Sequence, residues 1–375
     1  MKKILILGSG MIGRAIVKDL AKDYFIKVID INKENLLKLK DLGNVTTARV
    51  DATDLKSLKK HCNACDLVVS ALPGFLGFEV LREIIKCKKN VVDISFFSED
   101  AFELDELAKK NKIMALVDCG VAPGLSNVIL GYHNSKMNIN SFECMVGGLP
   151  VKREWPYQYK APFSPVDVIE EYTRPSRIVK DGNVIVKEAL SDVETIKVDS
   201  VGELEAFNTD GLRSLLKTMR IPNMIEKTLR YPGHTELMKI LRETGFFSNE
   251  KLLVNGNKIS PLEVTSKLLF PLWELKDNED EFTVLKIKIV GTENGKPTGY
   301  QYDIFDRYDD KTNISSMART TGYTCTAVTR LVLEGKFSQT GICPPEFVGA
   351  EPGCFDFVLD ELTKRRIHLI KKRLQ

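Results

Sequence analysis

Residues 2–13 read K-K-I-L-I-L-G-S-G-M-I-G, and residues 14–30 continue R-A-I-V-K-D-L-A-K-D-Y-F-I-K-V-I-D. The apolar run at 2–7 is short enough for one buried strand, residues 14–22 have helical spacing, and a second strand-like run ends at Asp30. Strand, glycine motif, helix, strand and acid in this order are typical of a dinucleotide-binding βαβ unit. The stretch therefore predicts a nucleotide site at the start of the chain.

Each position of the motif has a physical task. Gly8 permits the tight turn, Gly10 lets backbone N–H groups approach a pyrophosphate, and Gly13 allows close helix–strand packing. The whole turn is predicted to bind cofactor: Gly8, Ser9, Gly10, Met11, Ile12 and Gly13. Asp30 can accept hydrogen bonds from a ribose 2′-OH and would repel a 2′-phosphate. The predicted cofactor is therefore NAD, with NADP possible because Lys33 is near.

The first third of the chain alternates strands and helices. The predicted strands are 2–7, 25–29, 45–50, 67–72, 90–94 and 113–117, and the predicted helices are 14–22, one from 53, 78–86 and 101–110. This alternation is typical of an α/β fold with a Rossmann-type, doubly wound parallel sheet. Ligands of that fold bind beyond the carboxyl ends of the strands. The predicted strand ends carry Gly8–Gly13, Asp30, Asp51, Ser70–Pro73, Asp93–Ser95 and Asp118–Gly120.

After Pro123 the pattern changes to a second, α+β domain with a mixed or antiparallel sheet. Its predicted strands are 142–147, 177–186, 195–198, 282–291 and 298–309, and its predicted helices are 125–132, 212–219, 235–243 and 261–270. A long helix with many small residues at 315–334 is predicted to return to the first domain. The predicted boundaries are 1–125, completed by about 315–375, for the NAD-binding domain and 126–314 for the second, α+β domain.

The composition excludes several classes of protein. With 375 residues and 43% apolar residues the chain can form two domains with real cores. The 54 basic and 51 acidic residues leave a net charge of +3, which favours neither nucleic acid nor membrane. The basic residues at 364–373 are expected on the solvated end of a last helix.

No charged-then-apolar leader and no apolar stretch of about 18 residues are seen, so a cytoplasmic protein is expected. The eight cysteines are expected to be reduced thiols. Cys62 and Cys65 have metal-site spacing but no second pair, so no metal is predicted.

Polar residues at the predicted sheet edge are candidates for substrate contact. Asp118, in D-C-G-V-A-P-G, could bind a substrate ammonium at a strand end. Asp93 and Ser95 end the preceding strand, where each could face the same site or serve only as a turn residue. These three side chains mark where a small polar substrate would meet the nicotinamide.

Two segments of the second domain carry further candidates. In N-T-D-G-L-R, Asp210 is expected to cap a helix, whereas Arg213 could hold a carboxylate or make only a surface ion pair. In the loop L-R-Y-P-G-H, Tyr231 and His234 could donate hydrogen bonds or carry a proton near neutral pH, and His234 could instead cap a helix.

The chain resembles the saccharopine dehydrogenase, saccharopine reductase-like, superfamily, and most closely its lysine 6-dehydrogenases. The resemblance rests on strings across most of the chain: ILGSGMIGR, SALPGFLGF, VDISF, DCGVAPGLSN, VGGLP, EEYTRP, DGLRS, LRYPGH and SSMARTTGY. It implies a nicotinamide cofactor, a small amino-acid substrate and a homodimer, with 126–314 as the substrate-binding and dimerisation domain. It also implies cofactor contacts at Asp51, Ala52, Ala71 and Leu72, to which Pro73 at the same strand end is added. Substrate contacts are implied at Ser95, Asp118, Arg213, Arg230, Tyr231 and His234.

The reaction expected from this resemblance is oxidation of L-lysine by NAD and water to 2-aminoadipate 6-semialdehyde, ammonia and NADH. In this scheme Arg213 holds the α-carboxylate, Asp118 holds an ammonium, and His234 or Tyr231 moves protons. One alternative is a saccharopine or carboxyspermidine-type dehydrogenase, which condenses an aldehyde with an amine. The other is a non-catalytic protein that senses NAD(H).

Overall fold

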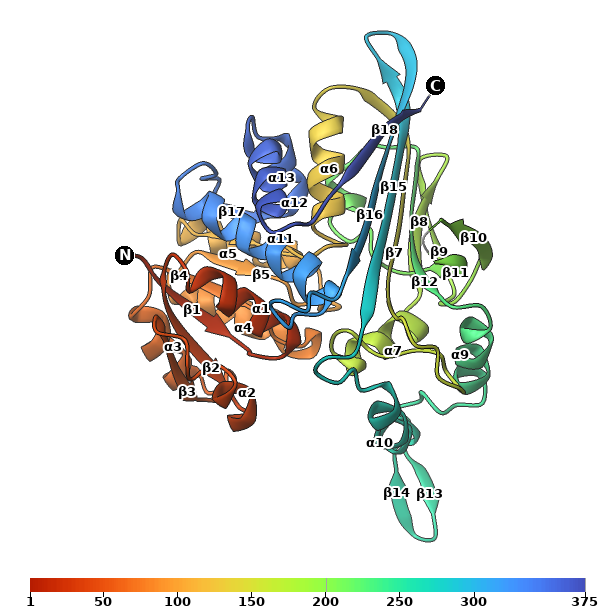
Figure 1. Cartoon of the computed structure of the whole chain (residues 1–375), viewed down its shortest axis with the longest axis horizontal. Coiled ribbons are helices and arrows are strands. Elements are labelled where there is room, and N and C mark those ends of the chain that lie inside the picture. Colours follow the sequence, from red (N-terminus) through yellow and green to blue (C-terminus); the bar gives the residue numbers. More distant parts are fainter. Residues whose placement is uncertain (200, 375) are drawn as a thin grey trace. The chain divides into compact units, whose positions relative to one another are not determined.

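The computed structural model describes residues 1–199 and 201–374, and its backbone divides into two compact units. Unit 1 comprises 1–138, 213–218 and 317–369; unit 2 comprises 139–212, 219–316 and 370–375. Figure 1 shows the elements of both units, coloured along the sequence. The two units are described separately below.

Unit 1 is built on a parallel seven-stranded sheet with the order β17-β6-β5-β4-β1-β2-β3. The strands are β1 (Lys3–Leu7), β2 (Phe25–Asp30), β3 (Val45–Arg49), β4 (Leu67–Ser70), β5 (Val91–Asp93), β6 (Met114–Leu116) and β17 (Gly341–Cys343). The chain reverses its direction of winding between β1 and β4, which is where ligands bind in such sheets. The predicted doubly wound fold is confirmed.

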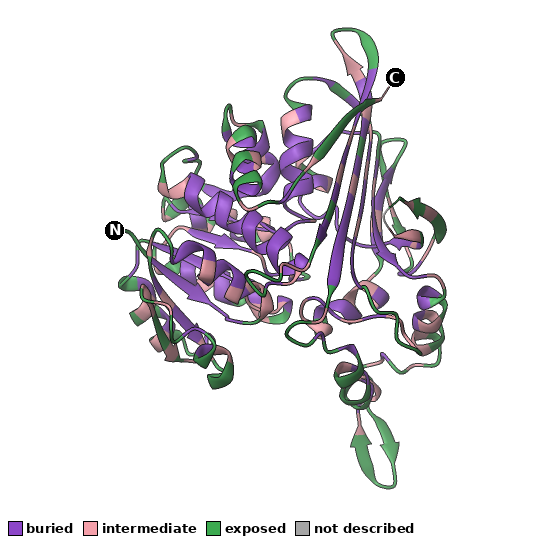
Figure 2. Ribbon diagram, in the orientation of Figure 1, coloured by how far each residue is buried: buried purple, intermediate pink, exposed green. Residues whose placement is uncertain are grey.

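Helices pack on this sheet because its strands are buried on both faces; Ile4 to Leu7 are fully buried, for example. Figure 2 shows the strands of unit 1 as mostly buried. The helices are α1 (Met11–Leu20), α2 (Lys33–Leu37), α3 (Leu55–Asn63), α4 (Gly74–Lys86), η1 (Ala101–Leu104), α5 (Asp105–Lys110), α6 (Leu125–Asn134), α8 (Leu215–Thr218), α11 (Ser316–Leu333), α12 (Pro345–Ala350) and α13 (Cys354–Lys364).

The boundary of unit 1 differs from the predicted one, because α6 and residues 213–218 belong to it. The helices α6 and α12 approach so closely that a Cβ on Gly131 would lie 2.0 Å from the Glu346 carbonyl oxygen, and one on Gly349 would lie 1.9 Å from that of Val128. This glycine-mediated contact ties α6 to the C-terminal helices of unit 1. The predicted helix at 212–219 shrinks to α8.

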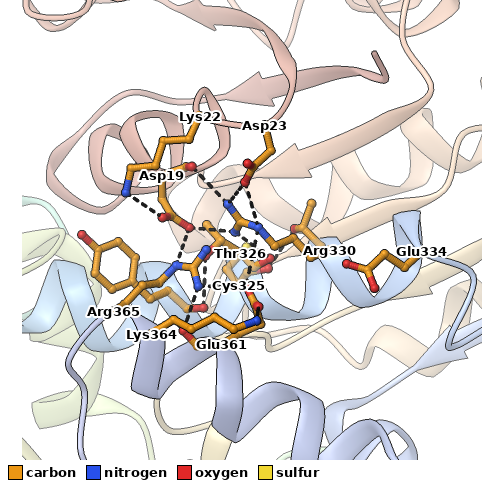
Figure 3. A network of polar contacts seen from close by, with 12 residues as sticks. Asp19, Lys22, Asp23, Cys325, Thr326, Arg330, Glu334, Glu361, Lys364 and Arg365 are labelled. Carbon is orange, nitrogen blue, oxygen red and sulfur yellow. Dashed lines mark hydrogen bonds and ion pairs between the residues drawn. The ribbon is translucent and has the colours of Figure 1, made fainter.

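A buried ion network joins α1 to the C-terminal helices of unit 1 (Figure 3). Asp19 of α1, with a side chain 1% exposed, lies 2.8 Å from Nη1 of Arg330 in α11 and 2.7 Å from Nε of Arg365. Glu361 of α13 lies 2.8 Å from Nη1 of Arg365. The helix that follows the glycine turn is therefore fixed by residues more than 300 positions away.

Unit 2 contains a nine-stranded mixed sheet, in which β7 and β12 are parallel and the other described pairs are antiparallel. Its strands are β7 (Asn138–Pro150), β8 (Ser176–Lys180), β9 (Asn183–Lys187), β10 (Glu194–Val198), β11 (Gly202–Asn208), β12 (Asn223–Arg230), β15 (Glu281–Glu293), β16 (Lys296–Arg307) and β18 (Ile370–Leu374). The helices are α7 (Pro165–Thr173), α9 (His234–Glu243) and α10 (Pro261–Trp273), and a separate hairpin is formed by β13 (Leu252–Val254) and β14 (Asn257–Ile259). The predicted mixed sheet is confirmed.

Three local predictions about unit 2 are wrong. The predicted strand at 177–186 is the hairpin of β8 and β9, which turns at Asp181 and Gly182 because both adopt positive φ. Asp210 does not cap a helix: its carboxylate accepts hydrogen bonds from the backbone N, Nε and Nη2 of Arg177. The basic residues after 369 do not end a helix, because they form β18 and pair with β16.

Neither a membrane span nor a metal cluster emerges from the part of the chain that the structure describes. Within residues 1–199 and 201–374, no helix has the length and apolar character needed to cross a bilayer. Over the same residues, no group of three or more His, Cys, Asp or Glu side chains is arranged to hold a metal ion.

Candidate functional site

Among the three glycines of the turn between β1 and α1, Gly10 is the one beside open space. Gly8 has a φ of +88°, and a Cβ there would lie 2.5 Å from the carbonyl oxygen of Ala71. A Cβ on Gly13 would lie 2.4 Å from the carbonyl oxygen of Gly8. By contrast, a Cβ on Gly10 would meet no atom within 4 Å. Gly8 and Gly13 thus serve internal packing, whereas Gly10 leaves open space at the start of α1.

The donors that face this space are the first N–H groups of α1. The helix has Gly10 as its N-cap, no side-chain cap and no acidic residue in its first turn. The first amides of a helix have no acceptor within the helix, and the helix dipole adds partial positive charge there. The first N–H groups of α1 have no side-chain cap and lie next to the open space at Gly10. This arrangement fits a pyrophosphate, so the residues present suit the predicted dinucleotide.

Asp30 is held in place at the end of β2. Its Oδ2 accepts hydrogen bonds from Ser9 N at 2.6 Å and Ser9 Oγ at 2.7 Å, and its Oδ1 accepts one from Asn32 N at 2.7 Å. A carboxylate has about four acceptor positions, so capacity remains for a ribose hydroxyl. The glycine turn therefore fixes the acid that the sequence predicts to contact ribose.

The other predicted cofactor residues lie at the ends of β3 and β4. Asp51 is exposed, and the pKa of its carboxyl is lowered by hydrogen bonds from the Thr53 hydroxyl and backbone N–H. Ala52 is buried, whereas Ala71, Leu72 and Pro73 are half-buried. Because β3 and β4 belong to the same parallel sheet as β1, these residues lie along one sheet edge with the glycine turn.

Gly10→Asp is expected to separate nucleotide binding from stability. Aspartate is a favourable N-cap, so the free energy of unfolding should stay the same or rise by about 0.5–1 kcal/mol. The same carboxylate would occupy the helix amides and repel a pyrophosphate, so NADH affinity should fall at least about a hundredfold. Fluorescence titration with NADH and thermal unfolding measure the two effects.

The matched control is Gly13→Ala, whose new Cβ meets the backbone of Gly8. It should lower the unfolding temperature, whereas Gly10→Asp should not. Undiminished NADH binding by Gly10→Asp would place the pyrophosphate elsewhere.

Asp118 and Arg213 form a buried ion pair. Nε of Arg213 lies 2.9 Å from both carboxylate oxygens of Asp118, and the side chains are 6% and 3% exposed. Both residues have positive φ, +41° for Arg213 and +56° for Asp118, a conformation that costs free energy outside glycine. Asp118 is thus paired with Arg213 in this structure, and the expectation that its carboxylate binds a substrate ammonium stays a prediction.

The rest of the Arg213 side chain is held by the loop after β5. Nη1 donates to the carbonyl oxygen of Phe97 at 2.5 Å, and the guanidinium lies 4.8 Å from the ring centre of Phe96 and 5.2 Å from that of Phe97. No residue in the described part of the chain accepts a hydrogen bond from Nη2. Arg213 is therefore fixed in orientation and keeps one NH2 group for a ligand.

Asp93 and Ser95 support this loop. Their exposed fractions are 0% and 1%, and Ser95 N donates to Oδ1 of Asp93 at 2.5 Å. Burial raises the pKa of Asp93 to about 7, although hydrogen bonds from Ser95 and Ser70 oppose the shift. Both side chains are buried in this structure, and the expectation that they contact substrate stays a prediction.

A second buried network anchors the segment that bears Arg213. Glu346 of α12 accepts hydrogen bonds from Thr218 Oγ1 at 2.6 Å and from Asn127 Nδ2 at 3.0 Å. Asn127 Nδ2 also lies 3.5 Å from Ser214 Oγ. Burial raises the pKa of Glu346, while the bonds from Thr218 and Asn127 lower it. Sequence reasoning missed Glu346, because 128 residues separate it from Thr218 and neither stands in a local pattern.

Arg230 is a core residue of unit 2. Its Nε donates to Tyr172 Oη at 3.0 Å, Nη1 to the Leu229 carbonyl oxygen at 2.9 Å, and Nη2 to Glu171 Oε2 at 2.5 Å and Tyr159 Oη at 3.3 Å. The residue is 2% exposed. All three nitrogens have internal acceptors, including the Glu171 carboxylate, so this geometry does not support the predicted substrate contact.

His234 belongs to the same buried network. Its Nδ1 lies 2.9 Å from the carbonyl oxygen of Tyr157, which can only accept, so Nδ1 carries the proton. Nε2 therefore accepts from Tyr172 Oη at 3.0 Å. Burial and the charge of Arg230 lower the pKa of His234 to about 3. The predicted proton carrier is thus neutral and fully bonded near neutral pH.

Tyr231 is also engaged within unit 2. Its Oη donates to the carbonyl oxygen of Pro150 at 2.9 Å, and the residue is 5% exposed. The Arg153 guanidinium lies 4.5 Å from its ring centre. Burial raises the pKa of Tyr231, so the phenol keeps its proton. The predicted role in proton transfer is not supported by this geometry.

His234 is expected to make unit 2 sensitive to acid. Its pKa rises from about 3 in the folded chain towards the ordinary value of 6.5 on unfolding, so the unfolded state binds more protons between these values. The contribution of His234 to the free energy of unfolding is therefore fully present above pH 6.5, and it is lost progressively as the pH drops from 6.5 towards 3. Urea unfolding at pH 7.5 and 5.0 measures this difference.

In His234→Gln the difference between the two pH values should shrink by about 1–2 kcal/mol. His368→Gln, at an exposed position, should leave it unchanged. An equal pH dependence in wild type and His234→Gln would contradict the assignment of a buried neutral imidazole.

Comparisons with known proteins agree with the fold of both units. The family model of the saccharopine dehydrogenase NADP binding domain matches residues 4–116, and that of the saccharopine dehydrogenase C-terminal domain matches residues 120–367. The solved structure of apo saccharopine dehydrogenase (L-Glu forming) from Saccharomyces cerevisiae covers all of both chains with a TM-score of 0.80 at 21% identity, which shows the same fold.

Two curated relatives differ in how much of their length is matched. The alpha-aminoadipic semialdehyde synthase of Arabidopsis thaliana is 28% identical over 263 residues, which are 64% of this chain but only 24% of that protein. The carboxyaminopropylagmatine dehydrogenase of Synechocystis is 24% identical over 385 residues, which are 94% of each protein. The chain thus spans about a quarter of the first relative and nearly all of the second.

Proposed function

Because this chain belongs to the saccharopine dehydrogenase family of oxidoreductases, we propose that it uses a nicotinamide dinucleotide to oxidise a carbon–nitrogen bond of a small amino acid. The substrate we propose is L-lysine, oxidised at its 6-amino group. Lysine, NAD and water then give 2-aminoadipate 6-semialdehyde, ammonia and NADH. The observation that carries this proposal is the single guanidinium that Asp118 and Phe97 hold at the sheet edge.

Arg213 is suited to bind a substrate carboxylate. Asp118 offsets most of its charge, so binding relies on hydrogen bonds from Nη2 in a fixed direction. Asp118 follows β6, and the glycine turn follows β1 in the same parallel sheet. A substrate held by Arg213 therefore lies at the edge that binds the dinucleotide.

Among the buried arginines, the number with an available Nη2 favours a substrate with one carboxylate. The buried Arg230 is bonded to Glu171, and the buried Arg330 is bonded to Asp19. Arg213 is the buried arginine whose Nη2 is left without an acceptor among the described residues. Lysine carries one carboxylate, whereas saccharopine carries three, so this arrangement supports lysine as the substrate.

The dinucleotide supplies the hydride acceptor when it is bound. The chain's own residues bind and orient: the first N–H groups of α1 bind the pyrophosphate, Asp30 binds the ribose, and Arg213 binds the carboxylate. Neither His234 nor Tyr231 is proposed as a proton carrier, since their polar atoms are bonded inside unit 2.

A condensing reaction is the second candidate. The name of the Synechocystis relative, which matches over 94% of both chains, describes a dehydrogenase of a carboxyalkylated amine. In that case NAD(P)H oxidation requires an aldehyde and a second amine together.

The test is a comparison of L-lysine, saccharopine and ornithine with NAD at alkaline pH, followed by NADH absorbance. NADH formation with lysine alone supports the proposal. Turnover of saccharopine with no response to lysine contradicts it in favour of the second candidate. Tight NADH binding without turnover of any amine would favour a protein that only senses the dinucleotide.

A further inference from the structure

A guanidinium group stands beside the ribose acid on the neighbouring strand. Arg49 is the last residue of β3, and in the parallel register it lies opposite Asp30, the last residue of β2. Its Nε donates to the carbonyl oxygen of Ile31 at 3.0 Å. This bond holds the Arg49 head group over the loop that follows Asp30.

The two opposite charges do not bond to each other. The oxygens of Asp30 accept hydrogen bonds from Ser9 and Asn32. Arg49 is exposed, and its Nη1 and Nη2 have no acceptor among residues 1–199 and 201–374. Asp30 is thus placed to accept a hydrogen bond from a ribose hydroxyl, while the Arg49 guanidinium beside it remains available for an anion.

We propose that Arg49 forms a 2′-phosphate subsite, so that the turn accepts NADP as well as NAD. A planar guanidinium binds phosphate oxygens through two parallel hydrogen bonds. Because the hydrogen bond from Nε to Ile31 already restricts the Arg49 side chain, binding costs less conformational entropy. Lys33, exposed at the first position of α2, adds positive charge nearby. Asp30 opposes the phosphate, so NAD binds more tightly than NADP. This inference rests on dinucleotide binding in the proposed function and not on the substrate.

The test compares NADH and NADPH affinities of the full chain by nicotinamide fluorescence. Arg49→Gln should weaken NADPH binding about tenfold and change NADH binding less than about twofold. Lys27→Gln is the matched control, because it removes the same positive charge away from the strand ends. Lys27 lies on β2, and its Nζ contacts the Thr47 carbonyl oxygen at 3.5 Å. Lys27→Gln should change neither affinity. Thermal unfolding confirms that each variant is folded.

Asp30→Asn provides a second, independent variant. It removes the negative charge and should raise NADPH affinity, and adding Arg49→Gln should cancel most of that gain. The proposal is overturned if Arg49→Gln weakens NADH and NADPH equally, because Arg49 would then contact a part that the two nucleotides share. It is also overturned if wild type binds NADH but no NADPH. If wild type binds neither nucleotide, the dinucleotide binding assumed in the proposed function is wrong. Absence of turnover with lysine would contradict the proposed substrate but would not affect the Arg49 result.

Discussion

Removing the Arg213 guanidinium is expected to lower kcat/KM for L-lysine about a hundredfold, because the substrate loses charge-assisted hydrogen bonds from Nη2. A single Arg213→Ala change would also leave Asp118 buried without its partner, at a cost of roughly 3–5 kcal/mol in folding. The pair is therefore best replaced together, as Arg213→Met with Asp118→Asn. Asparagine tolerates the positive φ of position 118. NADH formation at several lysine concentrations gives kcat and KM.

The control is a substrate without a carboxylate, 1,5-diaminopentane. Wild type should oxidise it slowly, and the double variant should do so at the same rate. NADH affinity should also be unchanged, since Gly10 and Asp30 are untouched. If the variant loses activity equally with both amines, Arg213 has only a structural role and the carboxylate assignment is wrong.

Arg330→Met is expected to lower the free energy of unfolding by about 3–5 kcal/mol, because it leaves a carboxylate that is 1% exposed without its main partner. Nη1 of Arg330 lies 2.8 Å from Asp19, and Nη2 lies 2.7 Å from Asp23 (Figure 3). Burial alone would raise the pKa of Asp19, but Arg330 and Arg365 hold it below its usual value. Urea unfolding at neutral pH measures the loss.

Lys22→Met is the matched control for this network. Lys22 also contacts Asp19, at 3.3 Å, but its side chain is 68% exposed, so water screens the pair. Its removal should change the free energy of unfolding by less than about 1 kcal/mol. Equal losses in the two variants would show that burial of Asp19 does not decide the energetics of the network.

The fold could be predicted wherever local pattern decides it. The glycine turn, the alternation of strands and helices and the acid at the end of β2 follow from spacing over about thirty residues. By contrast, β18 could not be recognised from the sequence. Its lysines and arginine are typical of a solvated helix end, and the segment forms a strand because it pairs with β16. Likewise α6 belongs to unit 1 through glycines that face each other across 218 positions, Gly131 and Gly349.

For the candidate site, the sequence indicates which polar residues are unusual, but it does not show what each of them contacts. Sequence identifies Asp118, Arg213, Arg230 and His234 as unusual polar residues, but burial and partners decide what each can do. Asp118 and Arg213 lie 95 positions apart and neutralise each other. The pKa of His234 is lowered because its ring is buried in the core and because Arg230 lies nearby.

The most direct test of the proposed function follows nitrogen from L-lysine labelled with 15N at the 6-amino group, with NAD and the purified protein. The proposal predicts equal amounts of NADH and 15N-ammonia, together with an aldehyde that still carries the unlabelled 2-amino group. Release of unlabelled ammonia would show oxidation at the 2-amino position. NADH formation without ammonia, or no NADH at all, would contradict lysine oxidation at the 6-amino group.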